Sequence, residues 1–241
     1  DDPVRPPPAV PPRELPADLP DFVGRADELA TLCAALGADT SGVRMATLSG
    51  PPGIGKTALA IRAGHRLADG FPDGQLFVSL RGATTDPIDP REALGQLLRA
   101  LGVGGPVLPR GLDARAALFR ARLADRRVLL VLDDASGHRQ IEPLIPSECS
   151  AVLATSRLPL TGIPGMVTVD LGTWDTGTAI ELMSRVVGSD RIRTSPDAAR
   201  VAEFCGGLPL AVRIAAARLA ARPQWTVEAF ADRLADERRR M

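Results

Sequence analysis

Several residue types are missing or scarce in this 241-residue chain. It contains no tyrosine and no asparagine, three cysteines, and one lysine beside 28 arginines. The cysteines are widely spaced and both histidines are distant from them, so neither a zinc site nor a disulfide framework is expected, and a reducing cytoplasm is the expected compartment. Because arginine replaces lysine everywhere else, Lys56 is expected where a guanidinium cannot serve.

Long apolar runs and an excess of one charge are also missing. No apolar run exceeds five residues, whereas a membrane-spanning helix needs about 20, so no membrane partner is expected. The 29 basic and 29 acidic side chains cancel, which argues against a broad face for DNA. Trp174 and Trp225 are expected to pack at domain edges rather than on a base. The chain begins at Asp1 rather than Met, which predicts part of a longer polypeptide.

Three segments are expected along the chain. Residues 1–20 contain eight prolines and predict an extended linker. Over residues 21–172, short apolar strand patterns alternate with amphipathic helical patterns, which is typical of a parallel, doubly wound α/β sheet. Only helical patterns follow, so residues 173–241 predict a small all-α domain. The strands are expected at 43–49, 75–80, 128–132, 151–155 and 166–171, and the helices at 25–36, 57–68, 91–101, 113–123, 175–187, 196–205, 208–221 and 227–238.

A phosphate-binding motif joins the first expected strand to the next helix. Residues 50–57 read GPPGIGKT, which fits GxxxxGK[ST]. Its glycines let backbone N–H groups converge on an anion, and the start of the helix adds partial positive charge. The Lys56 ammonium can reach between β- and γ-phosphates, and the Thr57 hydroxyl is placed to ligate Mg²⁺. The expected nucleotide contacts in this P-loop are Gly50, Pro52, Gly53, Ile54, Gly55, Lys56, Thr57 and Ala58.

Two carboxylates follow the apolar run at 128–132. Asp133 and Asp134 stand at the carboxyl end of an expected buried strand, where open parallel sheets bind ligands. Adjacent side chains on a strand point in opposite directions, so the two acids should have different roles. We expect Asp133 to hold Mg²⁺ through a water, and Asp134 to position or polarise an attacking water. Two solvated acids that end a strand are the alternative.

A second expected strand, at 151–155, ends beside an arginine. Arg157 follows Thr155 and Ser156, and it is placed to contact a γ-phosphate and so to report its presence. The alternative is a surface arginine, because one arginine among 28 carries little information. Lys56, Asp133, Asp134 and Arg157 are therefore the candidate catalytic residues.

The motifs, in this order, resemble the NB-ARC branch of the STAND-class P-loop ATPases. The resemblance covers about residues 21–238. Besides the P-loop, it is carried by FVGR (22–25) with Glu28, LLVLDD (129–134), ATSR (154–157) and CGGLPL (205–210). Two further stretches, LFVSLRG (76–82) and RIAAARLAARPQW (213–225), are similar to the central domain of SARP-type, AfsR-like transcriptional regulators.

The resemblance implies ligands, site residues and partner domains. Val23 and Arg25 would contact the adenine and ribose side, Pro209 would pack on adenine, Arg157 would sense the γ-phosphate, and Arg213 would reach the phosphates. The implied ligands are ATP or ADP with Mg²⁺. The implied partners are a DNA-binding domain before this segment, and a winged-helix domain with sensor repeats after it. The histidine motif of that winged-helix domain is not in this chain.

Three functions remain open from the sequence. The favoured one is a nucleotide-gated switch of a cytoplasmic regulator, in which slow, Mg²⁺-dependent ATP hydrolysis acts as a reset and the nucleotide controls activity or self-association. The second is an AAA+-like ATPase with continuous turnover, for which an Asp-Glu pair would be expected in place of Asp133 and Asp134. The third is a scaffold with a vestigial P-loop, and the retained Lys56 argues against it.

Overall fold

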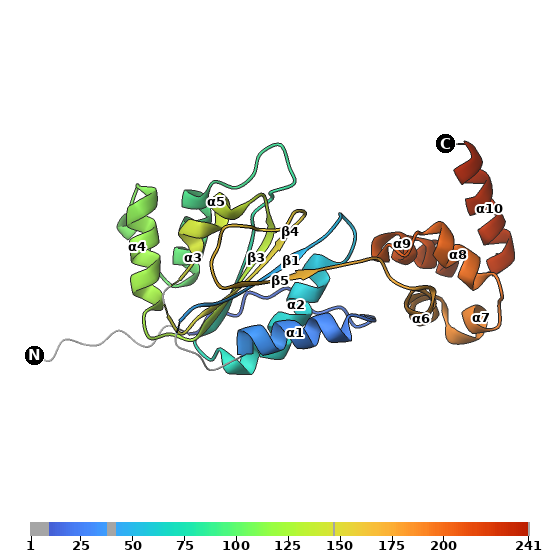
Figure 1. The fold of residues 1–241 in the computed structure, drawn as a ribbon, viewed down its shortest axis with the longest axis horizontal. Helices are drawn as coiled ribbons and strands as arrows, with labels where there is room; N and C mark the ends of the chain where they lie inside the picture. The colour runs from blue at the N-terminus through green and yellow to red at the C-terminus, as the bar shows by residue number, and fades with distance from the viewer. Residues whose placement is uncertain (1–9, 38–41, 147, 241) are drawn as a thin grey trace, which may run out of the picture. The chain divides into compact units, whose positions relative to one another are not determined.

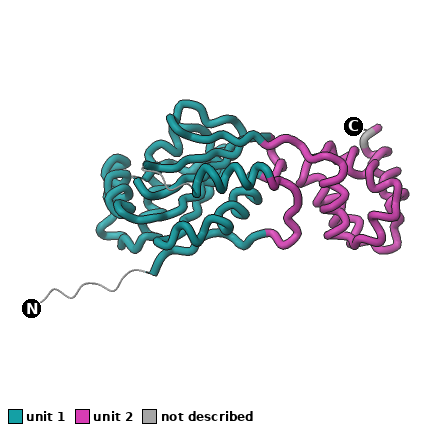
Figure 2. Tube along the Cα trace, turned by 60° about the horizontal axis from the view of Figure 1, so that its bottom comes forward, with its two compact units in different colours: residues 1–18, 27–50, 56–170 teal, residues 19–26, 51–55, 171–241 magenta. Residues whose placement is uncertain are grey.

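A computed structural model describes residues 10–37, 42–146 and 148–240 of the chain (Figure 1). Within them the chain forms two compact units, coloured separately in Figure 2. The first, here called the sheet unit, takes the segments up to Asp18, 27–50 and 56–170. The second, the helical unit, takes 19–26, 51–55 and 171–240. Residues from 171 onward belong to the helical unit, and two earlier segments group with them.

The sheet unit is built on parallel strands in the order β2-β3-β4-β1-β5. The apolar runs of β3 and β4 are buried on both faces, as expected for central strands covered by helices on either side. In Figure 1, α1 and α2 cover one face, and α3, α4 and α5 cover the other. The predicted parallel α/β architecture is confirmed. The strands are β1 (Arg44–Ser49), β2 (Gly74–Ser79), β3 (Val128–Ala135), β4 (Ala151–Ser156) and β5 (Met166–Asp170).

Local sequence explains where the helices of this unit begin and what they bury. At α3, the Asp89 carboxylate accepts the N–H of Arg91 at 2.8 Å, and Pro90 occupies the first helical position, where no N–H is needed. Fully buried Phe119 on α4 packs into the core of this face of the sheet. The α-helices are α1 (Ala26–Gly37), α2 (Lys56–Leu67), α3 (Pro90–Ala100), α4 (Leu112–Leu123) and α5 (His138–Ile141), and the 3₁₀ helices are Ala68–Gly70, Gly105–Val107 and Glu142–Leu144.

The described residues 10–18 lie on the sheet unit, whereas an extended linker was expected over 1–20. The N–H of Gln75 donates to the carbonyl of Pro12 at 2.8 Å, and the N–H of Glu14 donates to the carbonyl of Gln75 at 2.9 Å. Arg62 forms an ion pair with Asp18 at 2.9 Å. An extended, proline-rich backbone pairs with the β2 edge because an edge strand still has free N–H and C=O groups to offer.

The helical unit has its own apolar core. Asp175 begins α6 by accepting the N–H of Thr178 at 2.8 Å. Leu182, Val212 and Phe230 are buried in the core, and Val23 joins them from the 19–26 segment. Among the described residues, no helix is both long and apolar enough to cross a bilayer. The helices are α6 (Thr176–Val187), α7 (Ser189–Arg193), α8 (Ala198–Phe204), α9 (Pro209–Ala220) and α10 (Val227–Arg240).

Candidate nucleotide-binding site

The P-loop occupies the turn that the sequence predicted, between the end of β1 and the start of α2. Gly53 and Gly55 have φ values of 78° and 96°, in the left-handed region that favours glycine. A Cβ on Gly53 would also lie 3.1 Å from the Cβ of Leu210, so side-chain bulk is excluded there. The loop geometry thus depends on glycine at these positions, as a phosphate-binding turn requires.

Lys56 is largely buried at the first position of α2. Its Nζ donates to the carbonyl of Gly50, the first residue of the motif, at 2.7 Å. Burial lowers the pKa of Lys56, the positive charge of Arg157 lowers it further, and the carboxylates of Asp134 and Asp133 act in the opposite direction. An anion bound beside this ammonium would stabilise its charged form.

Asp133 and Thr57, the two expected magnesium ligands, meet in the structure. The Thr57 hydroxyl donates to Asp133 Oδ1 at 2.7 Å, and the Thr155 hydroxyl donates to the same oxygen at 2.8 Å. Mg²⁺ prefers oxygen ligands and is commonly held by one or two protein groups together with water and substrate phosphates. One hydroxyl and one carboxylate beside a P-loop fit that donor set. Among the described residues, no group of three or more His, Cys, Asp or Glu side chains is arranged to hold a metal ion.

Asp134 has different partners from Asp133, as the alternation along a strand predicts. Its backbone N–H donates to the Thr155 hydroxyl at 2.8 Å, and its Oδ2 accepts the N–H of Ala83 at 3.1 Å. Its carbonyl accepts the N–H of Gly82 at 2.6 Å. Asp134 itself has a φ of 54°, an uncommon value for a residue other than glycine. The turn after β2 therefore holds the second acid in place.

Sequence reasoning missed the residues that support the two acids. Thr155 was named only as a neighbour of Arg157, although its hydroxyl contacts both Asp133 and Asp134. Gly82 was noted only for the family resemblance. No sequence pattern singled out Gln140, yet its buried side-chain amide donates to the carbonyls of Leu80 and Ile88, which flank the turn after β2, at 3.0 and 2.8 Å. Such long-range support carries no local pattern in the chain.

The tip of the P-loop is bound within the helical unit by two of the predicted family segments. The N–H of Leu210 donates to the carbonyl of Gly53 at 3.1 Å. Arg25 donates to the carbonyl of Gly172 at 2.5 Å and, at 3.5 Å, to that of Ile54. The FVGR and GLPL segments therefore both contact the loop that is expected to hold phosphate.

The remaining predicted residues have clear places of their own. Val23 is 3% exposed and packs in the helical core, and Pro209 is buried at the first position of α9. Arg157 is exposed just beyond β4. Arg213 donates two bonds of 2.8 Å to the Asp21 carboxylate, and this contact lowers the pKa of Asp21. A phosphate contact by Arg213 would require that pair to open.

Comparisons with known proteins agree with this geometry. The family described as "AAA ATPase domain" matches residues 21–140. The regulatory protein AfsR of Streptomyces griseus is 44% identical over 234 residues, and that of Streptomyces coelicolor is 46% identical over 238 residues. Each alignment covers 95% of this chain and 24% of the regulator, so the chain spans about a quarter of those proteins.

Solved structures show the same fold at low identity. Cdc6p from Pyrobaculum aerophilum has a TM-score of 0.59 at 18% identity, with 87% of this chain and 64% of that chain covered. A STAND protein with a tetratricopeptide repeat sensor from Pyrococcus horikoshii has a TM-score of 0.52 at 20% identity, with 82% and 30% covered. The predicted resemblance to P-loop ATPase domains is therefore confirmed at the level of the fold and of sequence similarity: residues 21–140 match the AAA ATPase domain, and 95% of the chain aligns with a quarter of the AfsR regulators.

Proposed function

We propose that this chain is the nucleotide-gated switch of a larger cytoplasmic transcriptional regulator. It would bind ATP or ADP with Mg²⁺, hydrolyse ATP slowly, and use the bound state to control self-association or the activity of neighbouring domains. Support comes from its similarity to AfsR proteins, in which the matched region is 24% of the length. The partner domains expected are a DNA-binding domain before it, and a winged-helix domain and sensor repeats after it.

One observation carries the proposal: the P-loop tip groups with the helical unit, while Lys56 begins a helix of the sheet unit. The hydrogen bond from Leu210 to Gly53 ties the tip to the start of α9. Phosphate binding to this loop is therefore expected to affect the start of α9 through this hydrogen bond.

The proposed roles combine the P-loop geometry with what the family resemblance implies. Lys56 and the loop amides would bind the phosphates, and Val23, Arg25 and Pro209 would contact the base and ribose. Thr57 and Asp133 would hold Mg²⁺, which supplies charge neutralisation at the phosphates when bound. Asp134, held by the turn after β2, would position the attacking water. Arg157, whose positive charge lowers the pKa of Lys56, would contact the γ-phosphate.

Energetics indicate that the γ-phosphate does not act alone. Nucleotide at about 1,000 times its Kd stabilises the binding-competent state by about 4 kcal/mol. Moving a population from 1:99 to 99:1 requires about 5.5 kcal/mol of differential affinity. The remainder would come from self-association or from other domains of the regulator.

Calorimetry with the purified chain tests the proposal directly. ADP and ATP with Mg²⁺ should both bind, and Lys56→Ala should abolish binding. Asp134→Asn should keep binding and slow hydrolysis. Folded protein that gives no heat with either nucleotide would contradict the assignment and support a vestigial P-loop.

Continuous turnover is the second candidate, because the matching family is that of AAA ATPases. A steady-state phosphate-release assay separates the two. Slow release that DNA or RNA leaves unchanged supports the switch, whereas many turnovers per minute, raised by nucleic acid, support the motor-like alternative.

A further inference from the structure

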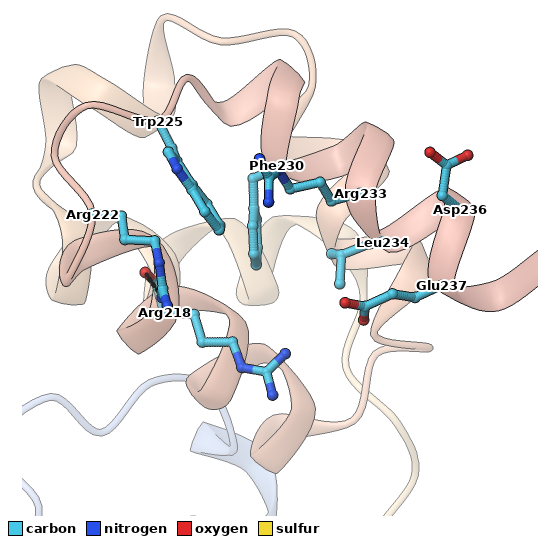
Figure 3. Close-up of a pocket in the computed structure, with 8 residues that line it drawn as sticks. All are labelled: Arg218, Arg222, Trp225, Phe230, Arg233, Leu234, Asp236 and Glu237. Carbon is cyan, nitrogen blue, oxygen red and sulfur yellow. Dashed lines mark hydrogen bonds between the residues drawn. The ribbon is translucent and has the colours of Figure 1, made fainter.

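A pocket of about 490 Å³ opens in the helical unit between the end of α9 and α10 (Figure 3). Trp225, Phe230 and Leu234 form its apolar wall. The ring centroids of Trp225 and Phe230 are 6.1 Å apart, with their planes tilted by 32°. Pockets that hold small molecules have volumes of about 300–1,000 Å³. The space therefore suits a ligand that contains one or two organic rings.

The wall is held in place by the half-buried side chain of Arg191. Arg191 on α7 donates to the carbonyls of Leu219 and Arg222, both at 2.9 Å, and to that of Trp225 at 2.5 Å. Phe230, the second ring, is only 3% exposed. These contacts fix the segment between α9 and α10, so a ligand would not have to order Trp225 when it binds.

Arginine side chains surround this ring. The guanidinium carbons of Arg222 and Arg233 lie 4.6 and 4.3 Å from the ring centroid of Trp225. A guanidinium stacked on an aromatic ring keeps its in-plane N–H groups for a carboxylate or phosphate. Arg218 adds a third cation from α9. Among the described residues, no carboxylate forms an ion pair with any of these three arginines.

Two acids restrict which anion the pocket accepts. Asp236 and Glu237 line the same space from α10, and Figure 3 shows both on the side of Leu234. A polyanion such as DNA would bring phosphates close to these carboxylates, and like charges repel. A ligand with one anionic group can place that group at the arginines and keep its rings away from the acids.

We propose that this pocket binds a small organic anion in which one carboxylate or phosphate is carried on an aromatic ring. The ring packs on Trp225, Phe230 and Leu234, and the anionic group accepts hydrogen bonds from Arg218 and Arg222. This assigns Trp225 a binding role where only edge packing was expected. The site lies outside the P-loop residues, and it does not depend on the switch proposed above.

Nuclear magnetic resonance tests the site through the indole N–H signals of the two tryptophans. Phenyl phosphate is the probe, inorganic phosphate supplies the anion without the ring, and phenol supplies the ring without the anion. We expect phenyl phosphate to shift the Trp225 signal saturably and leave that of Trp174 in place. Its Kd should be at least about tenfold lower than that of either fragment, since each contact alone contributes about 1 kcal/mol or more. A Trp225→Phe protein assigns the signals.

Matched variants decide whether the pocket is responsible. Arg222→Gln should weaken phenyl phosphate binding about tenfold, the loss expected for one charge-assisted contact. Arg193→Gln, at an exposed arginine of α7 outside the pocket, should leave it unchanged. Lys56→Ala should also keep the Trp225 shift, because phosphate at the P-loop is a separate event.

Three results would overturn the proposal. The first is a Trp225 signal that phenyl phosphate does not shift saturably. The second is inorganic phosphate or phenol binding as tightly as phenyl phosphate. The third is an equal loss of affinity in Arg193→Gln and Arg222→Gln, which would indicate a general effect of net charge.

Discussion

Replacing Gly82 by alanine tests whether the turn after β2 holds the second acid. A Cβ at position 82 would lie 2.2 Å from the backbone nitrogen of Ser136 and 2.5 Å from the carbonyl oxygen of Asp134. Both are backbone atoms, so the turn or β3 must move by about 1 Å. Overpacking of this kind costs about 1–3 kcal/mol. Weakening the hydrogen bonds from Gly82 and Ala83 to Asp134 costs about 1 kcal/mol each.

The combined loss is expected to be about 3–5 kcal/mol, which lowers the melting temperature by about 6–20 °C in a protein of this size. Differential scanning calorimetry measures it, and Gly105→Ala is the matched control because a Cβ there meets nothing within 4 Å. ATP hydrolysis should fall further than nucleotide binding, since Asp134 moves and the P-loop does not. A Gly82→Ala protein that melts and hydrolyses like the control would refute the coupling between this turn and Asp134.

The remaining predictions concern the other contacts of the site. Thr155→Val should destabilise the protein by about 2 kcal/mol, because it removes a donor to buried Asp133 and an acceptor for the backbone N–H of Asp134. Urea denaturation measures the loss, and a Thr155→Ser protein should retain most of the wild-type stability. Burial lowers the pKa of Lys56, so nucleotide affinity should fall as the pH rises toward that lowered value. Titration calorimetry across alkaline pH measures this. An affinity that does not change with pH would show that the ammonium does not contact the nucleotide. Arg213→Met should cost about 1 kcal/mol at pH 7, a typical upper value for a partly exposed pair. Arg213 holds the pKa of Asp21 in the folded protein below its usual value. The pair therefore stabilises the fold at pH values above the unfolded-state pKa of about 3.9. That stabilisation is lost as the pH falls through the lower pKa of the folded state. Wild type and Arg213→Met should therefore converge in acid melts, and a constant difference would contradict the pairing.

The sheet could be predicted because its signals are local. The apolar run at 128–132 forms the first five residues of β3, and the stretch at 151–155 forms most of β4. A strand buried on both faces must be apolar at consecutive positions, whatever its neighbours are. The P-loop was equally visible because all its functional groups lie within eight consecutive residues.

Other elements carried weaker signals. The short helix α7 was not predicted, because five residues hold too few turns for a periodic pattern. The pairing of residues 12–14 with β2 was not predicted either, since proline content alone favours an extended chain without naming its partner.

By itself, the sequence determined which groups are available: one ammonium, two adjacent carboxylates, and glycines at the positions where the backbone must turn. Periodicity and contiguous motifs fix these because they depend only on near neighbours in the chain. Tertiary structure alone decided which groups meet. Thr57 reaches Asp133 across 76 residues, and Arg213 reaches Asp21 across 192. Such meetings depend on strand order and helix packing, which bring together residues whose spacing in sequence follows no pattern.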